Sequence, residues 1–209
     1  PNGRVHRAEF NLGVALNFDR AERFVFDTLE AEAAIFLEDD LVLGPYYLRT
    51  MERLWDLAAA RDDIGYFSAF GMHKASLDQQ RKFADRIEPD MQNWAFGLTR
   101  KQWLKSAPYV DQYLDLVRGV DYRDRPHDKI AALYAQWGVP VKTSSQDTAK
   151  SIACHLTGSV KIKTYPVFGQ YIGREGLHAT PRLYEASGFH LTQVMEDDIF
   201  DKAEISDAE

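Results

Sequence analysis

The sequence predicts an α/β fold in which a mainly parallel sheet is flanked by helices. Short apolar runs of strand length, such as residues 33–37 and 64–70, alternate with longer segments of helical periodicity, such as residues 45–60. The chain has 209 residues, of which 45% are hydrophobic and 12% aromatic, so it can bury one sizeable core. We therefore expect a single domain over residues 1–209.

The first part of the chain is expected to form a helix, a strand and a second helix. Residues 11–30 have a largely helical apolar pattern, and Asn11 can cap its start. Residues 33–37 are continuously apolar, which is typical of a strand buried on both faces. Residues 45–60 are the clearest helix, with Pro45 in its first turn. Its apolar side chains share one face: Tyr47, Met51, Leu54, Trp55 and Ala58.

After a second apolar strand at residues 64–70, we expect residues 71–92 to form a mobile excursion. That segment is rich in charged residues and lacks periodicity, apart from one helical turn near 76–83. Next we expect a strand at 94–98 and a helix that runs from a Thr99 cap to Lys105. Two further helices are expected at 109–117 and 128–137, and Gly138 ends the second of them. The last expected strands are at 139–141 and 162–167.

Composition narrows the class of partner. The formal net charge is -7, which argues against a nucleic-acid partner because phosphate backbones need a basic surface. An acidic protein can still hold a phosphorylated ligand through a divalent cation. Cys154 is the single cysteine, so no intramolecular disulfide can form and a reducing compartment is favoured. No apolar run approaches the ~20 residues of a membrane span, and residues 1–10 show no secretory signal. We expect a cytoplasmic protein.

The acidic triplet Glu38-Asp39-Asp40 follows the apolar strand and precedes the Gly44-Pro45 break. Adjacent carboxylates repel one another unless a cation lies among them, and ligands bind where strands leave an α/β sheet. The alternative is a solvated turn. A Mg²⁺ or Mn²⁺ ion takes one or two carboxylates besides phosphates and water, so we expect Asp40 to be the metal ligand. If the diphosphate of a nucleotide sugar supplies the remaining ligands, Glu38 and Asp39 would lie near its sugar or ribose.

A second candidate is Asp128, at the start of the expected helix 128–137. A carboxylate there is stabilised by the helix dipole, which is also its plain structural role. If it faces a cleft, it can accept the proton of an attacking hydroxyl. Asp124 is the alternative residue for this role as general base.

A third candidate is the loop in which Gly173 and Gly176 flank Arg174. Glycines give the loop freedom, and the guanidinium fork matches a phosphate, although such loops are also ordinary turns. His155 or His178 could complete a metal site; a lone histidine is otherwise a packing or surface residue.

The order of these pieces resembles the GT-A glycosyltransferases, and more narrowly family thirteen, the inverting protein-linked-mannose β-1,2-N-acetylglucosaminyltransferases. An apolar strand leading into Glu-Asp-Asp is similar to their metal-binding motif. Residues 94–103 resemble the family's "GLGW…LW" strand and helix, and the acidic segment ending at Asp128 lies where the family keeps its base. Residues 168–178 resemble the "FG(R/K)KGVSH" loop, and Asn11-Leu12-Gly13 resembles an Asn-x-Gly near the nucleotide.

The resemblance implies a GT-A-like fold lacking its first nucleotide-binding strands, so that either the chain is a piece of a longer transferase or its nucleotide site is incomplete. It implies metal-dependent, inverting transfer of a GlcNAc-like sugar from a nucleotide-diphosphate donor, a UDP-sugar being favoured, to a glycan or other hydroxyl acceptor. Asp40 would bind Mn²⁺ or Mg²⁺, Asp128 or Asp124 would be the base, and Arg174, Asn11 and Gly13 would lie near the donor.

Two other functions stay open. The first is a non-catalytic, glycosyltransferase-like module that binds a sugar or a partner protein. The second, a metal phosphohydrolase, is disfavoured because Glu38 stands where such enzymes need a nucleophilic aspartate.

Overall fold

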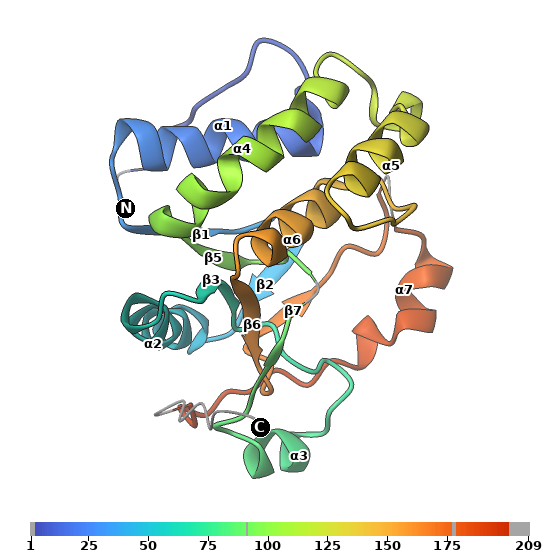
Figure 1. Cartoon of the computed structure of the whole chain (residues 1–209). Helices are drawn as coiled ribbons and strands as arrows, with labels where there is room; N and C mark the ends of the chain where they lie inside the picture. Colours follow the sequence, from blue (N-terminus) through green and yellow to red (C-terminus); the bar gives the residue numbers. More distant parts are fainter. Residues whose placement is uncertain (1–2, 91, 177–178, 201–209) are drawn as a thin grey trace. The chain divides into compact units, whose positions relative to one another are not determined.

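The computed structural model describes residues 3–90, 92–176 and 179–200 (Figure 1). It is a mixed α/β protein, as expected. The contacts group into two compact units. Unit 1 comprises Pro1–Ala31 and Leu104–Thr157, and unit 2 comprises Glu32–Trp103 and Gly158–Glu209.

Unit 2 is built on a five-stranded sheet in the order β1-β5-β3-β6-β4. The strands are β1 (Ala33–Phe36), β3 (Ile64–Ser68), β4 (Ile87–Pro89), β5 (Phe96–Thr99) and β6 (Val160–Thr164). Only β3 and β6 pair in parallel; the pairs β1–β5, β3–β5 and β4–β6 are antiparallel. The prediction of a mainly parallel sheet is therefore wrong, because a short apolar run does not reveal the direction of its neighbour.

Strand β1 lies at an edge of this sheet. Phe36 is buried, but Ile35 is 37% exposed and Ala33 and Ala34 are only partly covered. The expectation of a strand buried on both faces is wrong, since β5 is its one partner in the described sheet.

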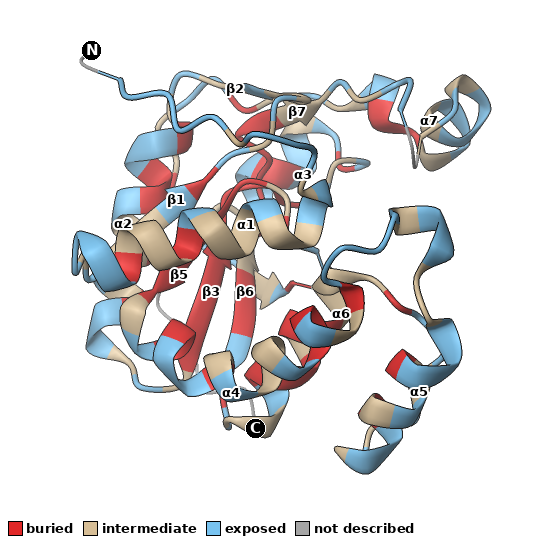
Figure 2. Cartoon of the chain, turned by 90° about the horizontal axis from the view of Figure 1, so that it is seen from above, coloured by how far each residue is buried: buried red, intermediate tan, exposed pale blue. Residues whose placement is uncertain are grey.

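The core of unit 2 joins helix α2 (Tyr47–Ala60) to the sheet. Four side chains of α2 are buried, as their helical spacing predicts: Tyr47, Met51, Leu54 and Ala58. Pro45 precedes the helix instead of lying in its first turn. Buried residues are concentrated along β3 and β5 in Figure 2. Burying this one face accounts for the position of α2.

Helix α3 (Leu77–Lys82) confirms the helical turn expected near residues 76–83, and it begins with a capping box between Ser76 and Gln79. Strand β4, in the same segment, was not expected. The buried Gln80 side chain donates to the carbonyls of Ala75 and Gln193. The contact with Gln193 joins segments distant in sequence, which local periodicity does not register.

A second, two-stranded sheet follows the acidic triplet directly. Its strands β2 (Leu41–Leu43) and β7 (Gly169–Tyr171) pair antiparallel, and the Gly44 amide extends the pairing to the Phe168 carbonyl at 2.7 Å. Beyond β7 lie helix α7 (Pro181–Ser187) and a short 3-10 turn, Phe189–Leu191. Neither was expected from the sequence.

Unit 1 is helical. Helix α1 (Gly13–Arg23) continues as a π-helix (Phe24–Thr28), which confirms a helix within residues 11–30. The others are α4 (Arg100–Val117, beginning in unit 2), α5 (His127–Gln136), α6 (Gln146–Leu156) and a 3-10 turn at Tyr122–Asp124. Their core includes Tyr113, Leu114, Ile130, Tyr134 and Ile152.

Two expectations in this region need correction. The helices expected at 99–105 and 109–117 are one helix, α4, that passes through Pro108. Pro108 and Leu104 are both exposed, so water can reach the carbonyl that the proline leaves without a donor. Residues 139–141 form no strand, and helix α6, capped by Ser145, was not predicted. The cap from Thr99 to the Gln102 amide is confirmed, as is the end of α5 near Gly138.

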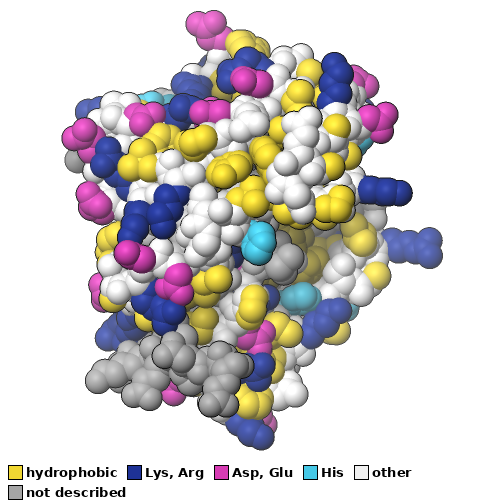
Figure 3. Space-filling model, in the orientation of Figure 1, with side chains coloured by type: hydrophobic (Ala, Val, Ile, Leu, Met, Phe, Trp, Pro, Cys, Tyr) yellow, Lys and Arg dark blue, Asp and Glu magenta, His cyan; other side chains and the backbone are white. Residues whose placement is uncertain are grey.

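Charge is mixed at the surface. Acidic and basic side chains are interspersed over the face shown in Figure 3. Among the residues that the structure describes, no helix combines the length and apolarity needed to cross a bilayer.

Candidate functional site

Asp40 carries the central carboxylate of the candidate site in unit 2. It lies between β1 and β2 and is partly buried. Its Oδ1 atom is buried and has no hydrogen-bond partner among the described residues, whereas its side chain is hydrogen-bonded to Tyr171. Burial raises the pKa of Asp40, and the neighbouring charge of Asp39 adds to this, against the hydrogen bond from Tyr171. A buried acceptor without a partner is costly, so this oxygen fits a cation or a donor from a ligand.

Tyr171 supplies the hydrogen bond to Asp40 from the last position of β7. Burial and the charges of Asp40 and Glu38 raise the pKa of Tyr171 to about 12. The phenol therefore keeps its proton at neutral pH and acts as the donor.

The loop after β7 lies against the same carboxylate. The Ile172 amide donates to the Asp40 backbone carbonyl at 2.8 Å. A Cβ atom on Gly173 would lie 2.7 Å from Asp40 Oδ2 and would also collide with the Tyr171 hydroxyl. Only glycine lets the backbone come this close. Because Oδ1 has no hydrogen-bond partner in the part of the chain that the structure describes, the hydrogen bond from Tyr171 is to Oδ2.

Aromatic rings surround the Tyr171 side chain. Trp94 stacks on it with ring centroids 4.7 Å apart and planes 2° apart. Phe189 meets both rings edge-on, at 5.2 Å from Trp94 and 4.9 Å from Tyr171. The Tyr184 hydroxyl donates to the Tyr171 carbonyl at 3.1 Å. We call Trp94, Tyr171, Tyr184 and Phe189 the aromatic cluster.

The position of Trp94 depends on an unusual backbone at Ala95. Ala95 is fully buried and has a φ of 42°, in the left-handed region that costs a non-glycine residue about 1–3 kcal/mol. The Tyr47 hydroxyl donates to its carbonyl, and the Ser68 hydroxyl donates to the Trp94 carbonyl at 3.3 Å. These bonds hold the strained turn that presents Trp94 to Tyr171.

The other two acids of the triplet differ from Asp40. Asp39 is exposed, and Glu38 is partly buried, with its charge acting on Tyr171. In the described ranges no three His, Cys, Asp or Glu side chains come together as a metal-binding group. One or two carboxylates suffice for Mg²⁺ or Mn²⁺ when phosphates and water complete the shell, so the Asp40 carboxylate fits such an ion.

Arg174, the expected diphosphate contact, is paired with Glu185 of α7 at 3.0 Å. Both side chains are more than half exposed, at 58% and 54%, so the pair is weak and can exchange for another anion. His178, a candidate metal ligand, lies outside the described residues.

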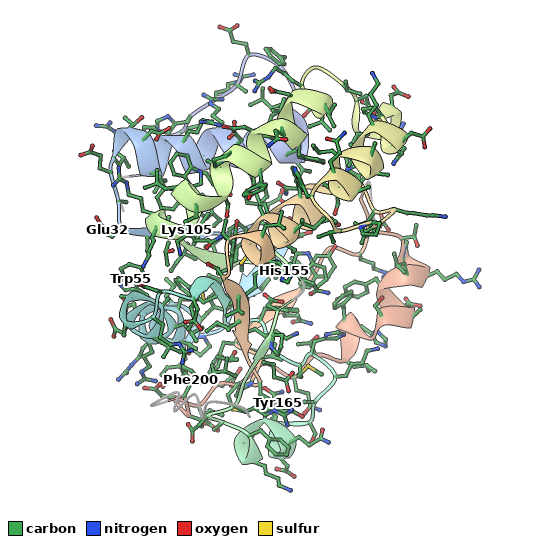
Figure 4. The ribbon with its side chains drawn as sticks, viewed as in Figure 1. Glu32, Trp55, Lys105, His155, Tyr165 and Phe200 are labelled. Atoms are coloured by element: carbon green, nitrogen blue, oxygen red, sulfur yellow. The ribbon has the colours of Figure 1, made fainter. Side chains whose placement is uncertain are left out.

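The remaining expected site residues belong to unit 1, whereas Asp40 belongs to unit 2. Asp128, in the first turn of α5, and Asp124 are both exposed. Asn11 Oδ1 accepts the Gly13 amide at 2.9 Å, a local turn that starts α1. His155 is exposed in the last turn of α6 (Figure 4).

Sequence reasoning missed Tyr171 and the rest of the aromatic cluster as site residues. No local pattern links Tyr171 with Asp40 or Trp94, because these residues come from distant segments.

Comparison with known proteins adds no family. No protein-family model matches the chain, and no curated protein matches it either. The resemblance to glycosyltransferases therefore depends on the residues described above.

Proposed function

We propose that this chain is a metal-dependent glycosyltransferase. It moves a GlcNAc-like sugar from a nucleotide-diphosphate donor, a UDP-sugar being favoured, to a glycan or other hydroxyl acceptor with inversion, in the cytoplasm. The observation that carries the proposal is the buried Oδ1 of Asp40, between β1 and β2, which has no hydrogen-bond partner among the described residues. The order of motifs resembling GT-A enzymes supports it.

In this proposal the residues divide the work. Asp40 holds Mn²⁺ or Mg²⁺, which when bound stabilises charge on the departing diphosphate. Glu38 and Asp39 lie near the sugar or ribose, and Arg174 exchanges Glu185 for a phosphate. Asp128 takes the proton of the acceptor hydroxyl, with Asp124 as the other acid to test. General-base assistance of this kind is worth ~10²–10⁴ in rate.

Calorimetric titration of UDP and of GDP, each with and without Mn²⁺, tests the metal site. We expect Mn²⁺-dependent binding of one nucleotide, and loss of that dependence in Asp40→Asn. Asp39→Asn is the matched control, because it removes an adjacent but exposed carboxylate and should keep the dependence. Equal behaviour of the two variants would refute the assignment of Asp40.

The base is tested by turnover of a UDP-sugar. Either Asp128→Asn or Asp124→Asn should lower the rate by ~10²–10⁴ while nucleotide binding is kept. If both variants retain most of the rate, neither acid is the base.

A non-catalytic, glycosyltransferase-like module is the second candidate. The ion pair between Arg174 and Glu185 favours this candidate, because it occupies the side chain that was expected to contact the donor phosphate. Metal-dependent hydrolysis of the donor would exclude this candidate, and metal-dependent binding without hydrolysis would support it.

A further inference from the structure

We infer that Tyr171 is a positioning residue for the metal-binding carboxylate. Its hydroxyl holds Oδ2 of Asp40, and this directs Oδ1 to the cation. The inference rests on the proposed function, because it concerns how the same site prefers its ion.

The two carboxylate oxygens of Asp40 have different surroundings. The terminal torsion of an aspartate is broad and nearly two-fold, so a free carboxylate presents either oxygen. Here Oδ2 faces the Tyr171 hydroxyl and Oδ1 is buried without a partner among the described residues. The hydrogen bond therefore selects one orientation.

Tyr171 is itself held in place. The parallel stack with Trp94 and the edge contact with Phe189 confine the ring. Its backbone also pairs with Leu41 across the β2–β7 ladder. A donor fixed on several sides can fix the acceptor that it contacts.

The backbone at Gly173 lies close to the same pair. Because a Cβ at this position would collide with the Tyr171 hydroxyl and Asp40 Oδ2, the loop leaves the pair little space in which to rotate. The Ile172 amide also ties the Asp40 carbonyl to the same loop. The carboxylate is thus oriented from its side chain and from its backbone.

A purely structural role would look different in solution. If the Tyr171 hydroxyl only satisfied a buried carboxylate, its removal would lower stability and leave metal affinity unchanged. Partners that orient a metal ligand typically contribute 10–100-fold to metal affinity. The two roles are therefore separable by measuring both quantities.

The test compares Tyr171→Phe with Tyr184→Phe. Each removes one phenol hydroxyl from the aromatic cluster and keeps the ring, but only the first contacts Asp40. Mn²⁺ alone is titrated into each protein and followed by the spin-resonance signal of free Mn²⁺, and thermal unfolding is recorded beside it. We expect Mn²⁺ affinity to fall about 10–100-fold in Tyr171→Phe and to change less than about twofold in Tyr184→Phe. Saturating Mn²⁺ should restore nucleotide binding to Tyr171→Phe.

Wild-type protein that does not bind Mn²⁺ would refute the proposed function, and the inference with it. Wild-type binding with equal affinity in Tyr171→Phe would overturn the inference alone. If Tyr171→Phe does not fold, Gly173→Ala displaces the same hydroxyl from the loop side, and unchanged Mn²⁺ affinity there would overturn the inference.

Discussion

The Tyr47 hydroxyl donates a hydrogen bond to the carbonyl of Ala95, so the first residue of α2 supports a strained residue just before β5. Both residues are fully buried. This bond connects the hydrophobic core of unit 2 with the turn that presents Trp94.

Tyr47→Phe should therefore destabilise the protein. The change leaves a buried carbonyl short of its donor, which costs about 1–3 kcal/mol in the free energy of unfolding. Urea denaturation measures the loss. Tyr46→Phe is the control, because Tyr46 precedes α2 and is only partly buried. Equal stability of the two variants would contradict the role given to the bond with Ala95.

The buried ion pair between Lys150 of α6 and Glu22 of α1 gives a second prediction. Their side chains are 4% and 3% exposed, and burial raises the pKa of Glu22. Lys150→Ala should cost about 3–5 kcal/mol, because it leaves a buried carboxylate unpaired. Replacing both residues, as Glu22→Leu with Lys150→Met, should recover most of that loss in the same denaturation experiment.

Arg118→Ala serves as the control for this pair. It breaks an exposed pair with Asp115 and should change stability by less than about 1 kcal/mol. A double variant as unstable as Lys150→Ala would show that the loss comes from packing and not from an unpaired charge.

His73 should make stability depend on pH. Burial lowers its pKa below 6.5, and the charges of Lys74 and Lys163 add to this, against a hydrogen bond with the Ser187 carbonyl. The unfolded chain therefore takes up a proton before the folded protein does as the pH falls. This contribution to stability is complete above about pH 6.5 and decreases as the pH falls through the lowered pKa.

Chemical denaturation at pH 7.5 and pH 5.5 measures the effect as a difference between wild type and His73→Gln. The glutamine amide can still donate to Ser187 but does not titrate. We expect the stability advantage of wild type to shrink at the lower pH, and a constant difference would contradict the assignment.

The pair between Arg174 and Glu185 gives a prediction on donor binding. Glu185→Gln should alter stability by less than about 1 kcal/mol, because both partners are exposed, and should keep or strengthen Mn²⁺-dependent UDP binding by freeing Arg174. Arg174→Gln should weaken UDP binding. Calorimetry checks both, and unchanged binding in Arg174→Gln would remove Arg174 from the donor site.

Elements with strong local signals could be predicted from the sequence. Helix α2 has an apolar face at regular spacing, and α5 ends near a glycine in the left-handed conformation. The direction of the strands could not be predicted, because pairing depends on segments far apart in the chain. Helix α6 was not predicted, because the charged Lys150 interrupts the apolar pattern of its buried side. The buried charge is tolerated because Lys150 is paired with Glu22.

The candidate site divides in the same way. Asp40 could be singled out because three acids directly follow an apolar run. Its hydrogen bond to Tyr171 and the stack of Tyr171 on Trp94 join segments that no sequence spacing relates. The collision that a side chain at Gly173 would cause is likewise visible only in three dimensions.

The stack of Trp94 on Tyr171 also gives the site an optical signal. Of the four tryptophans, Trp94 is the one whose indole lies flat on the phenol bonded to Asp40. With Trp55, Trp103 and Trp137 replaced by phenylalanine, the fluorescence of the protein would come from that indole alone. Changes around the Asp40 carboxylate could then be followed by the emission wavelength and fluorescence lifetime of Trp94, without attaching any dye.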